Sequence, residues 1–455
     1  MPSPNDGVAD LPIAIIGAGP IGLAAAAHCA ARQEPFVVIE GGAGPAASLM
    51  AWSHVPLFTP WRYNVDPVAV HMLEASGWTM PEADTYPTGG TLVERYLQPL
   101  ARHPDIAPCI RYGHRVHAIA RERCAKLDEE RDDHPFVLDM VDTAGRTTMI
   151  RARAVIDASG SWNTPNPLGA NGQFAAGEVE SGDCVFYGIP DIMGKDRPRY
   201  EGQRTLVVGS GHSAFHSLKH LAALAQEQPG ARVLWALRGE TATTAGCDGD
   251  GLTERTLVRR DIDTLLRDAA IEAFPGSRLT RLKRTPDGVV AWSDGTSLPP
   301  VDELIVATGF RPDHGIAREL RLDVHSVFES TYALAPLIDP TVSACGTVPP
   351  HGVAQLAHPE PDYYVVGVKS CGRAPTFLLL TGYEQVRSVV CALTSDEAAL
   401  TVELELPERG LCSACTAFLE ERDTACQCED DVPSSDCCAA PASERAREPQ
   451  GVAAD

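Results

Sequence analysis

The chain has 455 residues, of which 44% are hydrophobic, 22% charged and 6% aromatic. This length predicts two or three domains, and the composition is typical of a soluble globular protein. The formal net charge is −23, from 38 basic and 61 acidic residues, so neither general nucleic-acid binding nor binding to anionic membranes is expected.

Nothing in the sequence predicts a secreted or membrane-spanning protein. Residues 13–27 are apolar, but the residues before them include Asp6 and Asp10 and no Lys or Arg, which is the wrong charge for a secretory signal. No run of 18 or more strictly apolar residues predicts a membrane span. We therefore expect a cytoplasmic protein whose 14 cysteines are free, metal-bound or redox-active.

After a flexible N-terminus (residues 1–10), the first pattern is a strand within 11–17, a helix over 21–32 and a strand over 36–40. A glycine motif, GAGPIG, joins the first strand to the helix, at the position of a dinucleotide fingerprint. The carboxylate of Glu40 ends the second strand, where it would accept the ribose hydroxyls and repel a 2′-phosphate, so this site suits FAD or NAD. The predicted cofactor-binding residues here are Gly17, Gly19, Pro20, Gly22 and Glu40.

A second unit of the same kind follows about 190 residues later, with a strand over 205–209, a helix over 213–225 and a strand over 231–237. Its motif reads GSGHSA, with Ala in place of the third glycine. Arg238 follows the last strand and can pair with a 2′-phosphate, which favours NADPH, although Arg259 and Arg260 are rival partners. The predicted cofactor-binding residues are Gly209, Gly211, Ser213, Ala214 and Arg238.

Further patterns complete the expected sheets. Buried strands are predicted within 151–160, 301–310 and 362–368, a hairpin turn at Asp294-Gly295, and a helix over 376–393. The fold class is α/β, with two Rossmann-like, three-layer dinucleotide-binding domains. We expect a split FAD domain over 11–185 and 315–405, an inserted NADPH domain over 186–314, and a Cys-rich acidic tail over 406–455.

Together with residues 157–160 (DASG) and 307–312 (ATGFRP), the two glycine motifs resemble the flavoproteins that have two dinucleotide-binding domains, and most closely the flavin-containing monooxygenases. The resemblance covers roughly residues 12–395. It implies FAD in the first domain, NADPH in the second and catalysis between them, with Gly160 and Gly309 at the cofactors. One departure is the stretch 185–190 (VFYGIP), where those monooxygenases carry a phenylalanine-glycine-histidine fingerprint.

The disulfide reductases of the same superfold are the rival family. Their redox cysteines follow the first ribose acid or lie as CxxC in the NADPH domain, but residues 41–108 contain no Cys and the NADPH domain has Cys247 alone. The resemblance therefore favours electron transfer to O₂ and oxygenation of a soft nucleophile through a peroxyflavin, in a site that excludes water.

Two segments are predicted to border the flavin. In residues 57–64 (LFTPWRYN), the resemblance implies that Asn64 could donate to the peroxyflavin and that Trp61 and Arg62 could line the ring, while the alternative is a core Trp61 and a helix-capping Asn64. Residues 372–377 (GRAPTF) are expected to open the late helix, with Arg373 and Thr376 near the N1–C2=O edge of the flavin. An ordinary Pro-led helix start is the alternative.

The cysteines are unevenly placed. Cys345 and Cys371 flank the predicted flavin region and are candidate catalytic thiols, although small buried cysteines are the commoner case. Six more cysteines lie in the last 44 residues. Of these, the candidate ligands for Zn²⁺, Cu(I) or a trivalent metalloid are Cys412, Cys415, Cys426 and Cys428. A redox-shuttling tail and an acidic tail with incidental cysteines are the alternatives.

A flavin monooxygenase core with a thiol-rich tail resembles the monooxygenases of bacterial arsenic-resistance clusters. The resemblance implies oxidation of trivalent arsenic or antimony compounds. The leading hypothesis is thus an FAD- and NADPH-dependent monooxygenase acting with O₂ on a small soft nucleophile. The alternatives are an NADPH-dependent thiol-disulfide or metal(loid) reductase that uses the tail cysteines, and a non-catalytic nucleotide- or metalloid-binding redox sensor.

Overall fold

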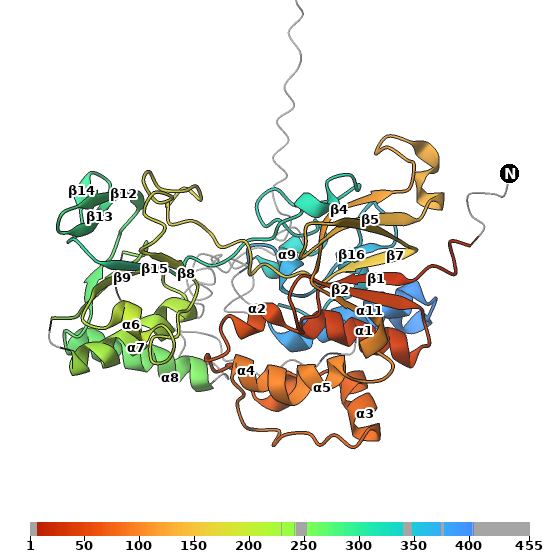
Figure 1. The fold of residues 1–455 in the computed structure, drawn as a ribbon, viewed down its shortest axis with the longest axis horizontal. Coiled ribbons are helices and arrows are strands. Elements are labelled where there is room, and N and C mark those ends of the chain that lie inside the picture. The colour runs from red at the N-terminus through yellow and green to blue at the C-terminus, as the bar shows by residue number, and fades with distance from the viewer. Residues whose placement is uncertain are drawn as a thin grey trace, which may run out of the picture.

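The computed structural model describes residues 7–228, 230–240, 242, 253–339, 348–374, 377–402 and 404. Two lobes lie side by side in Figure 1, each built around its own parallel sheet, and chain segments cross between them. Among the described helices, none has both the length and the apolar character needed to cross a membrane.

The first lobe contains a five-stranded parallel sheet in the order β16-β7-β1-β2-β3. Strands β1 and β7 pair in register, with Ile13 opposite Ala154 and Ile16 opposite Asp157. The central strands are apolar at nearly every position because both faces of the sheet are covered. The strands are β1 (Ile13–Ile16), β2 (Phe36–Glu40), β3 (Ile110–Tyr112), β7 (Ala154–Asp157) and β16 (Tyr363–Val365).

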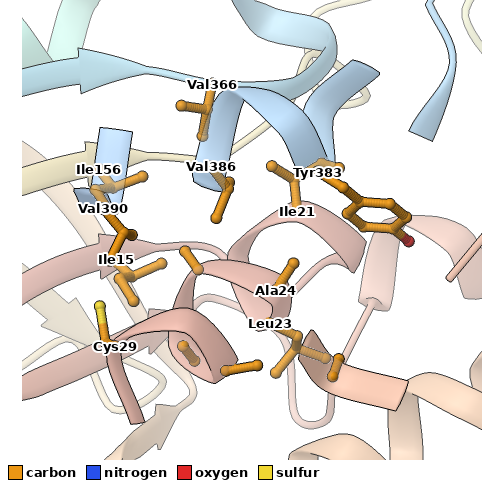
Figure 2. Close-up of a cluster of buried hydrophobic side chains, with 14 of the residues drawn as sticks. Ile15, Ile21, Leu23, Ala24, Cys29, Ile156, Val366, Tyr383, Val386 and Val390 are labelled. Atoms are coloured by element: carbon orange, nitrogen blue, oxygen red, sulfur yellow. The ribbon is translucent and has the colours of Figure 1, made fainter. Parts of the chain in front are cut away.

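Helices cover one face of this sheet. The Ala-rich helix α1 (Pro20–Ala31) packs closely against α11 (Leu379–Leu393) and against Ile15 and Ile156 of the sheet, as Figure 2 shows. Small side chains on α1 let the two helices and the sheet approach one another, and Tyr383 closes the end of this core. The remaining helices of this lobe are α2 (Ala47–Met50), α3 (Pro67–Ala75), α4 (Gly89–Leu92), α5 (Gln98–Ala101), α9 (Ala335–Ile338) and α10 (Val353–Leu356), with a π-helical segment at Val93–Leu97.

An antiparallel sheet covers the other face. It contains β4 (His114–Arg121), β5 (Phe136–Asp142) and β6 (Thr147–Ala152). Apolar side chains of this sheet pack on Ala14, Ile16 and Ile39 of the parallel sheet. The first lobe is therefore a three-layer arrangement of helices, parallel sheet and antiparallel sheet.

The second lobe repeats this arrangement. Its parallel sheet has the order β11-β10-β9-β15-β8, with α7 (His212–Glu227) and α8 (Thr253–Arg267) on one face and the antiparallel strands on the other. The short helix α6 (Arg197–Tyr200) precedes β9. The strands are β8 (Val185–Tyr187), β9 (Arg204–Val208), β10 (Arg232–Ala236), β11 (Glu272–Phe274) and β15 (Glu303–Val306) in the parallel sheet, and β12 (Leu279–Thr285), β13 (Gly288–Ser293) and β14 (Thr296–Ser297) in the antiparallel one.

The predicted α/β class with two Rossmann-like sheets is confirmed. The predicted Asp294-Gly295 turn is also present between β13 and β14, with positive φ at both residues. The predicted domain boundary at residue 185 needs correction, because Leu168, Ala175 and Cys184 already pack in the core of the second lobe. The chain therefore crosses between the lobes before residue 168.

Candidate dinucleotide sites

The first glycine turn has a different steric demand at each of its three glycines. A Cβ on Gly17, whose φ is +100°, would lie 2.7 Å from the carbonyl oxygen of Ala158, and a Cβ on Gly22 would lie 1.9 Å from the carbonyl oxygen of Gly17. A Cβ on Gly19 would meet nothing within 4 Å. Gly17 and Gly22 are thus required by packing, whereas the space at Gly19, where α1 begins at Pro20, is open to a pyrophosphate.

The carboxylate of Glu40 lies at the carboxyl end of β2, beside this turn. One oxygen accepts a hydrogen bond from the backbone N–H of Ala18 at 2.7 Å and the other accepts one from Gly42 at 2.7 Å. Each carboxylate oxygen keeps further acceptor capacity. The side chain is therefore held in place with lone pairs free for ribose hydroxyls, which fits the predicted dinucleotide.

The second glycine turn has the same construction. A Cβ on Gly209, with φ +128°, would lie 2.3 Å from the carbonyl oxygen of Ala307, whereas a Cβ on Gly211 would meet nothing within 4 Å. Ala214 is fully buried on α7, which explains why only a small residue is suitable there. Ser213 lies in the first turn of α7, and Arg238 is exposed after β10. The open space at this helix N-terminus fits a second dinucleotide.

Two crossing segments hold the lobes together between these sites. The N–H of Asn166 donates to the carbonyl of Gly309 at 2.9 Å, and the N–H of Arg311 donates to the carbonyl of Thr164 at 3.1 Å. The rings of Trp162 and Phe310 stack across the same pair, with centroids 4.8 Å apart. Both Gly160 and Gly309 have positive φ, which their sharp turns at the strand ends require.

The loop predicted to border the flavin is largely a buried structural element. The amide of Asn64 donates to the carbonyls of Thr59 at 2.7 Å and Pro60 at 3.0 Å, and the residue is fully buried. Trp61 lies in the hydrophobic core, and Arg62 is exposed and paired with Asp84. To donate a hydrogen bond to the flavin, the amide of Asn64 would have to give up one of these two donor bonds. The role predicted for Asn64 stays a prediction.

In the second predicted flavin segment, Gly372 and Arg373 lie in a turn, and the helix that follows, α11, begins at Leu379. Arg373 pairs with Glu329 at 2.8 Å. Cys371 is 1% exposed in the hydrophobic core, and burial raises the pKa of its thiol to about 12. These two features fit a protonated thiol packed in the core, and the catalytic role of Cys371 stays a prediction.

Several predicted site residues lie outside the described residues. These are Cys345, Thr376, Cys412, Cys415, Cys426 and Cys428. The six cysteines that the structure describes are all free, without a disulfide among them. Within the same described ranges, no group of three or more His, Cys, Asp or Glu side chains is arranged to hold a metal ion.

One buried charge pair was not predicted from the sequence. The Lys369 ammonium lies 2.7 Å from an oxygen of Asp157 and 3.1 Å from the hydroxyl of Ser159, and the hydroxyl of Tyr363 donates to the same carboxylate at 3.1 Å. A lysine directly after the apolar strand of residues 362–368 was the available signal, since buried lysines are rare unless paired.

Comparison with solved structures finds the same architecture in both reductases and oxygenases. The bacillithiol disulfide reductase of Staphylococcus aureus superposes with a TM-score of 0.60 at 16% identity, covering 85% of this chain and 98% of that one. A doubly substituted flavin monooxygenase from Stenotrophomonas maltophilia gives 0.55 at 21% identity, with coverage of 85% and 98%. The ornithine N-hydroxylase of Kutzneria sp. 744 gives 0.57 at 15% identity, with coverage of 85% and 99%.

These identities establish a shared fold. No curated protein sequence matches the chain. The family model of the pyridine nucleotide-disulphide oxidoreductases matches residues 14–339, which include both glycine turns, the whole second parallel sheet and the first parallel sheet except β16 and the first residue of β1. The chain therefore belongs to the pyridine nucleotide-disulphide oxidoreductase family.

Proposed function

We propose that the protein is an FAD- and NADPH-dependent monooxygenase that oxygenates a small, soft nucleophile. The observation that carries the proposal is the pair of glycine turns, open at Gly19 and Gly211 and each closed by packing at its first glycine. Among the similar structures, that of the hydroxylase from Kutzneria contains reduced FAD, NADP⁺ and L-ornithine, which supports this choice of cofactors.

Each of the two glycine turns would bind one of the two cofactors. Gly19 and the N-terminus of α1 would receive the FAD pyrophosphate, and Glu40 would receive its adenosine ribose. Gly211, Ser213 and Arg238 would receive NADPH, with the Arg238 guanidinium against the 2′-phosphate. Bound FAD would supply the two-electron redox chemistry between NADPH and O₂. In the balanced reaction, substrate, O₂, NADPH and a proton give oxygenated substrate, water and NADP⁺.

The state of the described cysteines supports an oxygenase over a reductase with a core disulfide. All six are free, and burial raises the pKa of each thiol above its ordinary value. A redox disulfide needs two cysteines in reach of each other and a reactive thiolate. Electrons leaving the flavin therefore have no thiol acceptor among the residues that the structure describes.

As a finer proposal, trivalent arsenic or antimony compounds are the candidate substrates. Their lone pair makes them soft nucleophiles, and their separate affinity for thiolates suits the cysteine pairs at 412–415 and 426–428 in the sequence. We expect arsenite, methylarsenite or antimonite to accelerate NADPH consumption, with one O₂ consumed per pentavalent product. Identical rates with and without all three compounds would rule out these substrates.

A reductase is the second candidate, because the matching family is named for disulphide reduction and a bacillithiol disulfide reductase shares the fold. In that case, the tail cysteines would receive the electrons. The two candidates differ in what they consume, since the monooxygenase uses O₂ and the reductase does not. Oxygen uptake during NADPH oxidation therefore separates them, with hydrogen peroxide measured alongside to account for uncoupled turnover.

A further inference from the structure

The buried side chain of Lys369 connects two loops at the carboxyl edge of the first sheet. Lys369 lies in the loop after β16. Of its two partners, Asp157 is the last residue of β7 and Ser159 lies in the loop that follows it. The side chains of Lys369 and Asp157 are 2% and 0% exposed. The Asp157 carboxylate accepts further hydrogen bonds from the N–H and hydroxyl of Ser159 at 3.1 and 2.6 Å and from the hydroxyl of Tyr363. This network pins the two loops to each other.

Stability alone is a poor explanation for such a pair. Transferring two charges from water into a protein interior costs much of what their attraction returns, and apolar side chains of similar volume are often as stabilising. Burial by itself raises the pKa of Asp157, but the charge and hydrogen bond of Lys369, together with the two hydrogen bonds from Ser159, outweigh it and hold that pKa below its usual range. The Asp157 carboxylate is therefore ionised at neutral pH, and a charge buried this deeply calls for a role besides stability.

The position of the two loops indicates what that role is. The loop after β7 reaches the first glycine turn, because the carbonyl of Ala158 lies against Gly17. The loop after β16 reaches the start of α1, because a Cβ on Gly367 would lie 3.2 Å from the side chain of Ile21. The two loops thus contact the glycine turn on either side of Gly19, one at Gly17 and the other at Ile21.

We propose that Lys369 is a positioning residue for FAD, which holds these two loops at the spacing that the first dinucleotide site requires through its bonds to Asp157 and Ser159. This inference rests on the proposed function, since it assumes that the first site takes FAD. Lys369 acts through the loops, and its loss should therefore weaken cofactor retention beyond any general loss of stability.

The test compares two buried cations in the full-length protein. Lys369→Met removes the cation at the carboxyl edge, whereas Arg131→Met removes an equally buried cation that pairs with Glu360 at 3.0 Å, before the amino end of β16. After removal of the flavin, the Kd for added FAD is measured from its fluorescence, and the thermal midpoint is measured without FAD. We expect Lys369→Met to raise the Kd about tenfold or more, and Arg131→Met to change it less than about twofold.

The same FAD titration measures whether Asp157 and Lys369 are coupled, and it can overturn the inference. If the pair acts as one unit, the effects of Asp157→Asn and Lys369→Met on the Kd should not add in the double variant. Equal Kd values for Lys369→Met and the unsubstituted protein would overturn the inference, whereas an unsubstituted protein that does not bind FAD would overturn the proposed function instead.

A milder variant serves if Lys369→Met does not fold. Ser159→Ala deletes one hydrogen bond to the ammonium and should raise the FAD Kd about threefold, since one hydrogen bond contributes roughly 0.5–1.5 kcal/mol. An unchanged Kd for this variant would likewise overturn the inference.

Discussion

At the scale of single residues, glycines within one motif have different physical roles. Gly22 allows helix α1 to approach the preceding turn, because its Cβ would lie 1.9 Å from a backbone oxygen, whereas the space at Gly19 is empty of protein. The backbone of Gly19, at φ −76° and ψ −176°, is one that any residue adopts. A side chain at Gly19 therefore conflicts with a ligand alone, and a side chain at Gly22 conflicts with the fold.

Two substitutions separate these roles. Gly19→Val should leave the free energy of unfolding of the flavin-free protein nearly unchanged and raise the FAD Kd at least about tenfold. Gly22→Ala should lower that free energy by about 1–3 kcal/mol, the usual cost of overpacking. Urea unfolding and flavin titration measure the two quantities. A Gly19→Val protein that binds FAD normally would show that the open space is not the pyrophosphate site.

At the scale of elements, strands and helices with local signals were predictable and those without were not. The βαβ units follow from apolar strands joined by glycine turns, and β2 was predicted with its observed bounds at 36–40. The antiparallel strands β4–β6 were not predicted, because their inner faces become apolar only in the context of the parallel sheet they cover. Likewise, the Asp157–Lys369 pair joins residues 212 positions apart, which no local pattern can indicate.

Helix α7 contributes histidines to a contact between the lobes, with the rings of His216 and His54 6.2 Å apart and those of His216 and His220 4.4 Å apart. Burial, followed by the nearby His220 and His54, lowers the pKa of His216 to about 3. Because the pKa of His216 is lower in the folded protein than in the unfolded chain, the unfolded chain protonates this histidine first as the pH falls below about 6.5. This residue's contribution to stability is therefore complete above pH 6.5 and declines as the pH falls toward 3.

The variant His216→Phe cannot take up this proton. We expect its free energy of unfolding to depend less steeply on pH between 6.5 and 4.5, by about 1.4 kcal/mol per pH unit. Chemical unfolding at several pH values gives the slope, and His71→Phe, on an exposed residue, controls for the loss of one imidazole. Equal slopes for His216→Phe and the unsubstituted protein would contradict a neutral, buried His216.

At the scale of the whole molecule, two lobes of the same three-layer design present their glycine turns at the carboxyl edges of their sheets. The paired crossing segments at Asn166 and Gly309 join the lobes, so both cofactors of the proposed function would be held on one framework. The described helices and strands of this framework lie between Ile13 and Leu400, and the cysteine pairs of the tail lie beyond them in the sequence. The two candidate functions assign different parts of the chain to catalysis.

Ending the chain after Leu406 tests that difference. If the protein is a monooxygenase, the shortened chain should bind FAD and keep NADPH-dependent O₂ uptake within about twofold, because both dinucleotide sites precede residue 406. If the tail cysteines receive the electrons, turnover of a disulfide substrate should be lost while the flavin is still reduced by NADPH, since reduction precedes transfer to the tail. Replacing all six tail cysteines by Ser in the full-length chain is the matched control, because it removes the thiols and keeps the length. A shortened chain that loses both O₂ uptake and flavin reduction would contradict the assignment of catalysis to the two lobes.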